Sequence, residues 1–375
     1  MAKKDEEDKK IISIEDFNEE IIKIVNKKDK AMYKPEDTEK PSNVGGYIST
    51  GSTILDYQLA NQRYGGIPIG RITSVSGDSS SGKSLLAFQI IANAQKMRAP
   101  VFYADTERAS DERFMKRVGV QLDKLPPWYP KSLEDFFEQT EKIIIKTREA
   151  FPDKERPVLI VLDSVAATPC EVENENNYDA NARMGVLGKT LSLGLKKITQ
   201  IVGSECVTVL LLNQLRMKIN AMRFEDPFVE PGGKAAEFYT SVRMRLHKKA
   251  KVKDPITNEI LGVGCLASIK KNKLAPAHRE AYFNLMFDRG IDDEGSVFEF
   301  LKEREIVRKR SNGNTIFEGD KCGINFEKEF PSNSWRSFHQ ENEEMVLDVL
   351  DKLLIKEYTD TSNLNTEQIV VEKEE

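Results

Sequence analysis

The segment from Gly77 to Ser84 reads Gly-Asp-Ser-Ser-Ser-Gly-Lys-Ser and stands between an apolar run and a helical pattern. Glycines let backbone amides turn inward around an anion, and the following helix directs its N-terminus at the same anion. The lysine side chain reaches terminal phosphates, and the serine hydroxyl is a ligand for Mg²⁺. We therefore predict a nucleoside triphosphate site with Mg²⁺, formed by Gly77, Asp78, Ser79, Ser80, Ser81, Gly82, Lys83, Ser84 and Leu85.

The sequence around this loop alternates between short apolar runs and helical patterns. A strand is predicted over residues 72–76 and a helix over 83–96, and further apolar runs cover residues 101–104, 158–162 and 207–212. A helical pattern over residues 187–201 precedes the last run. Fully apolar strands separated by helices are typical of a buried, mostly parallel sheet, so the sequence predicts an α/β fold with a twisted central sheet flanked by helices.

The chain is divided by changes in composition. We predict an N-terminal helix and linker over residues 1–45, a core over 46–296, a small C-terminal α/β domain over 297–357 and a flexible acidic tail over 358–375. Phe17, Ile21, Ile24 and Val25 form an apolar stripe on a predicted helix over residues 13–28. This stripe could pack on its own domain or dock on a neighbouring subunit. In the C-terminal domain, helices are predicted over residues 297–307 and 335–354.

Composition excludes several classes of protein. The sequence of 375 residues has no apolar run of about 18 residues, which argues against a membrane span, and its charged N-terminus lacks a secretory signal. The four cysteines are scattered, which favours free thiols in a reducing cytoplasm, and the three dispersed histidines indicate no zinc site. The net charge of −5 argues weakly against nucleic acid, but basic residues cluster at 243–253 and 270–273.

Polar residues that end the apolar runs are candidates for catalysis. Asp163 follows a buried strand and can hold the Mg²⁺ shell beside the phosphate loop. Glu107 or Asp105 could orient and deprotonate a water that attacks the γ-phosphorus, or could simply cap the next helix. Gln214 could sense the γ-phosphate and transmit its presence to the segment that follows.

Several segments, in the same order, resemble the RecA-type homologous-recombination strand-exchange proteins. The resemblance covers about residues 48–291 and rests on Ser-Thr-Gly-Ser at 49–52, Gly-Gly-Ile-Pro-Ile-Gly-Arg at 65–71, Asn-Gln-Leu-Arg-Met-Lys-Ile at 213–219, Gly-Gly-Lys-Ala at 232–235 and Lys-Asn-Lys-Leu-Ala-Pro at 271–276. It implies a RecA-type P-loop ATPase core.

The resemblance also implies individual roles at the ATP site. Glu107 is similar to the carboxylate that activates water, Lys83 to the phosphate-loop lysine and Gln214 to the γ-phosphate sensor. Asp111 and Phe114 resemble adenine contacts, and Phe287 resembles the opposite wall of the adenine slot. The remaining implied roles involve a neighbouring subunit: Lys271 and Lys273 reach into its ATP site, Phe238 contacts it, and the N-terminal helix docks on it.

DNA contacts are implied in two loops. The first covers about residues 175–184, with Met184 and Lys189 at its exit, and the second runs from about 215 to Gly232 and Gly233. In the second loop Arg216, Lys218 and Arg223 can neutralise phosphates, and Met217 and Ile219 can wedge between bases. Arg243 and Arg245 begin a basic stretch that could bind a second DNA duplex, or could be an ordinary solvated face.

The function implied is that of a DNA-dependent ATPase. It would form a helical filament on single-stranded DNA and exchange strands with homologous double-stranded DNA in recombination and repair. The same ATPase core could instead serve a hexameric helicase or motor, or an ATP-binding recombination mediator. Acidic residues within 171–181 and 225–230, and the loss of resemblance after residue 296, are typical of phage-encoded members, which would act in the bacterial host cytoplasm.

Overall fold

The computed structural model describes residues 14–27, 30–34, 36–37, 40, 42–152, 154, 156–175, 185–218, 226–254 and 256–356. The chain forms two compact units, Met1–Asn43 and Val44–Glu375. The first unit contains helix α1 (Ile14–Val25), close to the predicted span. Three residues of its apolar stripe, Phe17, Ile24 and Val25, are exposed. The predicted tail at 358–375 lies outside the described residues.

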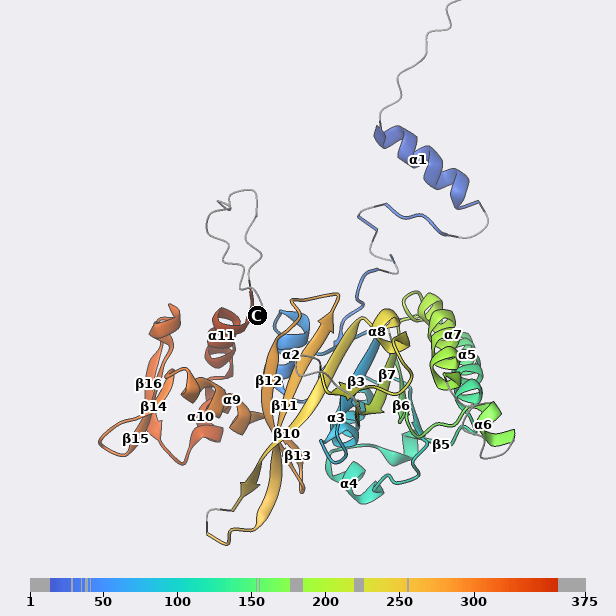
Figure 1. Cartoon of the computed structure of the whole chain (residues 1–375). Helices are drawn as coiled ribbons and strands as arrows, with labels where there is room; N and C mark the ends of the chain where they lie inside the picture. Colours follow the sequence, from blue (N-terminus) through green and yellow to red (C-terminus); the bar gives the residue numbers. More distant parts are fainter. Residues whose placement is uncertain are drawn as a thin grey trace, which may run out of the picture. The chain divides into compact units, whose positions relative to one another are not determined.

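The second unit is built on a nine-stranded sheet (Figure 1). Its parallel part contains the strands predicted from the apolar runs, and its antiparallel part follows them in the chain. The spatial order is β13 (Gly290–Asp292), β12 (Glu280–Met286), β11 (Ile260–Asn272), β10 (Val242–Lys253), β3 (Ile72–Gly77), β7 (Val207–Gln214), β6 (Val158–Asp163), β4 (Val101–Asp105) and β5 (Pro127–Trp128). Pairing is parallel from β10 through β5 and antiparallel from β10 through β13. The predicted α/β class is therefore confirmed.

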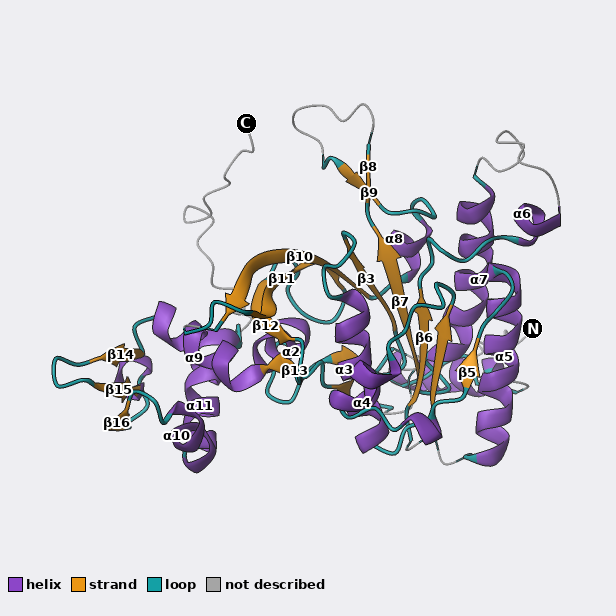
Figure 2. Ribbon diagram, turned by 90° about the horizontal axis from the view of Figure 1, so that it is seen from below, coloured by secondary structure: helices purple, strands orange, loops and turns teal. Residues whose placement is uncertain are grey.

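Helices cover both faces of the sheet (Figure 2), and strand β6 shows why. Its residues are buried throughout. Leu159 and Val161 pack in one hydrophobic cluster with α2 (Thr53–Ala60), α3 (Lys83–Lys96) and α4 (Glu112–Arg117). The alternate residues of β6 pack in a second cluster with α5 (Leu133–Ala150) and α7 (Val186–Val202). The five apolar residues of β6 before Asp163 can pack against helices on both faces of the sheet, because successive side chains of a strand point to opposite faces.

The register of the parallel strands brings their polar ends together. Asp105 at the end of β4 is paired with Asp163 at the end of β6, and Gly77 at the end of β3 is paired with Gln214 at the end of β7. Ligands of open α/β sheets bind outside these carboxyl ends. The site predicted from separate motifs is thus assembled at one edge of the sheet.

Several short elements complete the core. They are β1 (Tyr47–Ile48), β2 (Ile67–Pro68), a 3₁₀ turn at Leu122–Lys124, α6 (Glu171–Glu175), β8 (Arg216–Met217), β9 (Phe228–Val229) and α8 (Ala235–Tyr239). Strands β1 and β2 pair with each other, as do β8 and β9, which both lie within the predicted second DNA loop.

The C-terminal segment differs in detail from its prediction. It contains α9 (Asp293–Glu303), a small sheet of β14 (Val307–Lys309), β15 (Asn314–Glu318) and β16 (Glu327–Pro331), a 3₁₀ turn at Gly319–Cys322, and helices α10 (Trp335–Glu341) and α11 (Glu343–Leu354). The C-terminal end predicted for the helix over 297–307 was wrong, because α9 ends at Glu303 and β14 begins at Val307. The single helix predicted over 335–354 was also wrong, because Asn342, with φ of −127° and ψ of 29°, is not helical and separates two helices.

Polar contacts attach this segment to the core. The Tyr57 hydroxyl on α2 donates to Asp351 on α11 at 2.5 Å. The Arg63 guanidinium donates to Asp351 and Asp348. The segment shares the hydrophobic cluster of α2 and α3, and the predicted boundary at 296/297 falls inside α9.

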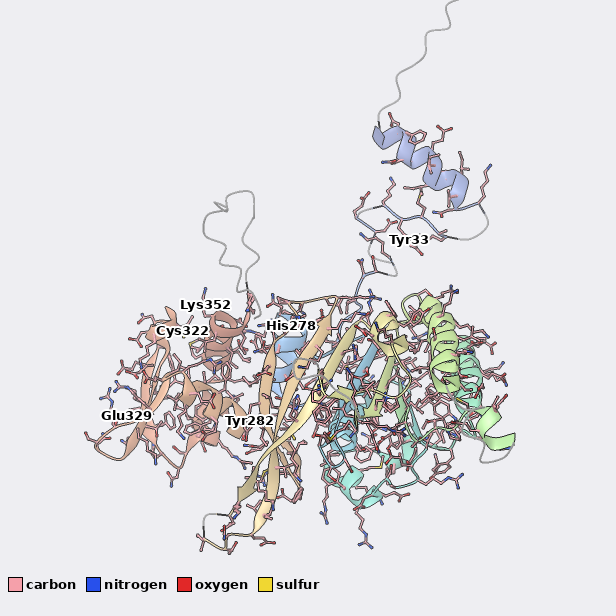
Figure 3. All side chains as sticks on the ribbon, in the orientation of Figure 1. Tyr33, His278, Tyr282, Cys322, Glu329 and Lys352 are labelled. Atoms are coloured by element: carbon pink, nitrogen blue, oxygen red, sulfur yellow. The ribbon has the colours of Figure 1, made fainter. Side chains whose placement is uncertain are left out.

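All four cysteines are free, as predicted; Cys322 lies in the C-terminal segment (Figure 3). Within the described ranges, none of the helices combines the length and apolar character needed to cross a membrane.

Candidate functional site

The phosphate loop has the backbone conformation that its glycines allow. Gly82 precedes helix α3 with φ of +94°, and a Cβ there would lie 2.3 Å from a methyl carbon of Leu285. Glycine is therefore required at this position both by φ and by space. The Lys83 ammonium donates to the carbonyls of Gly77 and Asp78 at 2.9 and 2.8 Å. Burial lowers the pKa of Lys83, and the carboxylates of Asp163 and Glu107 oppose that shift.

Asp163 lies beside Ser84 at the end of β6. It is buried, and burial raises its pKa against the hydrogen bonds that the hydroxyls of Ser84 and Tyr103 donate to it. The Tyr103 hydroxyl is 2.9 Å from Oδ2 of Asp163. A carboxylate and a hydroxyl in contact are the oxygen ligands that Mg²⁺ prefers. The predicted metal ligands, Ser84 and Asp163, therefore fit a magnesium ion.

Glu107 is exposed and is held in place by two donors. Its Oε1 accepts from the Ser164 hydroxyl at 2.8 Å and from Nε2 of Gln214 at 2.7 Å. The next helix, α4, is capped by Asp111 instead, so the alternative in which Glu107 caps that helix does not describe the structure. A carboxylate that faces the phosphate loop and touches the end of β7 is placed to act on a bound phosphate.

These groups line a cavity of about 450 Å³. Most of its walls come from residues predicted for the ATP site. The lining residues are Ser79, Ser80, Ser81, Gly82, Lys83, Ser84, Leu85, Glu107, Asp163, Gln214, Lys248, Val263 and Phe287. Lys248 and Val263 were not predicted. Lys248 belongs to the basic stretch at 243–253, which gave a reason to expect charge there but none to expect it beside the phosphate loop.

The three predicted adenine contacts do not line a single cavity. Phe287 lies in the larger one, whereas Asp111 and Phe114 line a neighbouring cavity of about 170 Å³ that also reaches Ser84 and Glu107. Asp111 accepts from the amides of Arg113 and Phe114 and so begins α4. Phe114 is buried and packs against Phe88.

The residues predicted to act on a neighbouring subunit lie outside both cavities of their own chain. The Lys271 ammonium donates to the carbonyls of Glu237 and Phe238. The amide of Lys273 donates to the carbonyl of Ser241. Phe238 exposes 68% of its surface. All three lie near the junction of α8 and the end of β11.

The described parts of the two predicted DNA loops lie close together. Lys189 is exposed in the first turn of α7, and a Cβ on the adjacent Gly188 would be 3.4 Å from the carbonyl of Gly232. Gly232 and Gly233 have φ of +93° and +65°. Met184, Ile219 and Arg223 lie outside the described residues.

The described start of the second loop is held in a short ribbon. Arg216 and Met217 form β8 and pair with β9, and the amide of Lys218 donates to the carbonyl of Pro227 at 2.8 Å. Met217 exposes 72% of its surface.

Arg243 and Arg245 face acidic residues of the chain itself. Nη2 of Arg243 lies 3.0 Å from Glu230, and Nη1 of Arg245 lies 2.7 Å from Asp226. Both arginine side chains are largely buried. The DNA contacts predicted for Arg243 and Arg245 did not include these partners, which belong to the acidic segment at 225–230.

The chain was compared with known families and proteins. Residues 19–292 match the RecA N-terminal domain. Protein RecA of Wolinella succinogenes is 35% identical over 317 residues, which are 84% of each chain. Protein RecA of Nitratiruptor sp. is 39% identical over 262 residues, covering 70% of this chain and 72% of that protein, and protein RecA of Streptomyces avermitilis is 33% identical over 315 residues, covering 84% and 78%. With a phosphate loop, Glu107 and Gln214 assembled at one edge of the matched domain, the chain belongs to the RecA family.

Proposed function

We propose that the cavity beside Glu107 is the ATP-hydrolysis site and that residues 215–233 couple this site to DNA. Members of the RecA family are DNA-dependent ATPases, so this chain hydrolyses ATP, assembles on single-stranded DNA as a homo-oligomeric filament and exchanges strands with homologous double-stranded DNA in recombination and repair. The single observation that carries the proposal is the hydrogen bond of 2.7 Å from Gln214 to Glu107.

In the proposed hydrolysis step, a water attacks the γ-phosphorus of ATP. Its oxygen forms a bond to phosphorus as the bond to the bridging oxygen of ADP breaks, and Glu107 accepts the proton of the water. Ser164 and Gln214 orient the Glu107 carboxylate through their hydrogen bonds. Lys83 leaves the carbonyls of Gly77 and Asp78 to contact the terminal phosphates.

Ser84 and Asp163 are proposed to hold Mg²⁺. A bound Mg²⁺ would supply positive charge that offsets the charge of the nucleotide phosphates. Deprotonated Asp163 is the form that binds a metal, and a cation beside this carboxylate favours that form despite burial. Asp111, Phe114 and Phe287 are proposed to hold the base of the nucleotide.

DNA is proposed to bind where the two loops meet. Lys189, Arg216 and Lys218 supply positive charge for phosphates, and the exposed Met217 supplies an apolar side chain that can enter a base step. Met184, Ile219 and Arg223, from the same loops, are proposed to contribute in the same way. Gly232 and Gly233 allow the chain to return close to α7. Gln214 stands between this region and Glu107, so DNA and ATP binding are linked.

The site of action proposed is the cytoplasm, which agrees with four free thiols. If the chain is phage-encoded, the compartment is the cytoplasm of the bacterial host.

The test is ATP turnover by Glu107→Gln with and without single-stranded DNA. Loss of the proton acceptor is expected to lower turnover about 100-fold or more while ATP binding and assembly are retained. Glu112→Gln is the matched control, because Glu112 is an exposed acid of α4 that lines neither of the two cavities described above. Turnover near that of the unmodified chain in Glu107→Gln would show that the base is misassigned.

Two other outcomes would point to the alternative functions. Closed rings instead of open helices, seen by electron microscopy with single-stranded DNA and a slowly hydrolysed ATP analogue, would favour a hexameric motor. Turnover that DNA does not stimulate would favour a recombination mediator.

A further inference from the structure

Two ion pairs join the returning limb of the second loop to strand β10. Arg245 contacts Asp226 at 2.7 Å, and Arg243 contacts Glu230 at 3.0 Å. The side chains of Arg243, Arg245 and Glu230 retain 19%, 10% and 8% exposure, and that of Asp226 retains 47%. The Arg243–Glu230 pair is therefore screened by salt much less than a surface pair, and the Arg245–Asp226 pair is partly buried through its arginine.

The two arginines lie on the same face of β10, because they are two residues apart in a strand. Arg243 is paired with Ser74 and Arg245 with Ser76 on β3, the strand that leads into the phosphate loop. The guanidinium of Arg245 also lies 5.8 Å from the centre of the Phe228 ring on β9. The limb that carries Asp226, Phe228 and Glu230 is therefore fastened to the strand next to the one that bears the nucleotide site.

The same limb is connected to the catalytic groups. Nδ2 of Asn213 donates to the carbonyl of Pro231 at 2.9 Å, and the adjacent Gln214 donates to Glu107. Asn213 and Gln214 end β7 at the start of the segment, and Pro231 follows Glu230 at its end. Both ends of residues 215–231 are thus held within one hydrogen-bonded and ion-paired group that reaches Glu107.

The surroundings of Asp226 favour its charged form. Burial acts to raise the pKa of Asp226, but the amide of Phe228 and the guanidinium of Arg245 outweigh it, and the pKa lies below its usual range. Nε of both arginines is buried and has no hydrogen-bond partner among the residues that the structure describes. Removal of Asp226 would leave the largely buried Arg245 guanidinium without this carboxylate partner, and removal of Glu230 would leave Arg243 with the more distant Glu237, at 4.0 Å; both changes are unfavourable.

We infer that Arg243 and Arg245 are positioning residues that anchor the DNA-binding segment to the ATPase core, with Asp226 and Glu230 in the place that a DNA phosphate would otherwise take. The two pairs keep the limb 226–231 on β10, so that a displacement of Gln214 at the ATP site is passed to residues 215–218 instead of being lost in a freely moving loop. This assignment replaces direct DNA contact by Arg243 and Arg245. The coupling between the ATP site and DNA rests on the proposed function, whereas the anchoring of the limb by the two arginines does not.

The first experiment exchanges the charges of one pair. Arg245→Asp and Asp226→Arg each place like charges together, and each is expected to lower DNA-stimulated ATP turnover about tenfold or more. The double variant, Arg245→Asp with Asp226→Arg, restores an opposite-charge pair and is expected to recover most of the turnover. A double variant no better than the worse single variant would overturn the inference.

The second experiment separates anchoring from DNA contact. The logarithm of the affinity for single-stranded DNA falls with the logarithm of salt concentration by about 0.7 for each phosphate neutralised. Arg243→Gln and Arg245→Gln are expected to leave this slope unchanged, whereas Lys218→Gln, the comparison variant, is expected to reduce it by about 0.7. A reduction of that size in either arginine variant would show that the arginine binds DNA directly.

A third measurement needs neither DNA nor ATP. Hydrogen exchange at the amide of Lys218, which donates to the backbone carbonyl of Pro227, reports whether the limb is held. Exchange is expected to rise in each single charge variant and to return in the double variant, with circular dichroism showing that the core remains folded. If the unmodified chain lacked DNA-stimulated turnover, the proposed function would be wrong, but the exchange measurement would still test the anchoring. Unchanged exchange in the single variants would show that the ion pairs do not anchor the limb.

Discussion

Glu107 and Asp163 are carboxylates in one cavity, but their surroundings suit them to different tasks. Asp163 is buried and receives hydrogen bonds from the hydroxyls of Ser84 and Tyr103. Those two hydroxyls hold the carboxylate still, and one of them can share a metal ion with it. Glu107 is exposed at the mouth of the cavity and accepts from Ser164 and Gln214. It can therefore meet a water, and its orientation depends on Gln214.

Lys248 is the one unanticipated cation that lines the nucleotide cavity. An ammonium beside the phosphate loop attracts the negative charge of bound ATP, but it cannot act as a base in the chemical step. Lys248→Ala is therefore expected to raise the KM for ATP about threefold with little change in kcat, since an exposed charge contributes modestly. Lys249→Ala is the control, because its neighbouring ammonium does not line the cavity. An unchanged KM in Lys248→Ala would remove Lys248 from the site.

The sequence predicted most of the residues that line the cavity, for two physical reasons. The phosphate loop has a fixed spacing, and parallel strands place the residues that follow them at one edge, which located Glu107, Asp163 and Gln214. Tyr103 and Ser164 were missed because a side chain within a buried strand, or just after one, carries no signal of what it will contact. The acids that face Arg243 and Arg245 were missed because ion pairs between segments depend on the register of β10.

At the scale of elements, the packing of α5 on α7 depends on one residue without a side chain. Gly194 lies on α7 against Phe137 of α5, and a Cβ on Gly194 would fall 2.1 Å from the ring. Helix propensity alone would favour alanine over glycine by about 1 kcal/mol. The free-energy cost of the close contact is expected to exceed this gain in helix propensity, because overpacking a core costs about 1–3 kcal/mol.

Gly194→Ala is therefore expected to lower the free energy of unfolding by about 1 kcal/mol, despite the better helix propensity of alanine. Urea denaturation followed by circular dichroism measures this difference. Lys196→Ala on the exposed side of α7 serves as the control and is expected to change the value by less than about 0.5 kcal/mol. A Gly194→Ala chain as stable as the unmodified one would mean that α5 and α7 can separate at no cost.

The strands over 72–76, 101–104, 158–162 and 207–212 and the helices over 83–96 and 187–201 were predicted close to their observed bounds, whereas α5 and the strands β10 to β13 were not predicted. The apolar runs over 101–104, 158–162 and 207–212 became β4, β6 and β7, because strands that are buried on both faces consist mostly of apolar residues. The break at Asn342 could not be foreseen, because Val346, Leu347 and Leu350 continue the same apolar pattern on α11 and hide the interruption.

At the scale of the whole molecule, the described chain contains one side of the predicted ATP site. The cavity includes the phosphate loop, the proposed base and the proposed metal ligands, but Lys271 and Lys273 lie outside it. A pair of lysines supplied by a neighbour would make hydrolysis depend on assembly, which links filament formation to ATP binding.

Lys271→Ala with Lys273→Ala is accordingly expected to retain ATP binding and to lose DNA-stimulated hydrolysis by about 100-fold, the usual effect of removing charge stabilisation from a transition state. Nucleotide binding and turnover are measured separately with single-stranded DNA present. Lys302→Ala with Lys352→Ala removes the same charge from exposed positions and is the control. Full stimulation in the Lys271 and Lys273 variant would rule out this role for the two lysines.

The class of fold and the family could be read from the sequence because many separate segments occur in a fixed order. The family match ends at residue 292, close to where the predicted resemblance ended. The arrangement of α9 to α11 could not be read in this way. It depends on contacts such as Tyr57 and Arg63 with Asp351, which join residues far apart in the chain.

The most direct test of the account is the formation of joint molecules from single-stranded DNA and duplex DNA in the presence of ATP and Mg²⁺. The unmodified chain is expected to form them with a homologous duplex and not with a non-homologous duplex of the same length and composition. Equal yields with the two duplexes, or none with the homologous one while ATP is hydrolysed, would contradict the conclusion that this chain pairs and exchanges homologous strands.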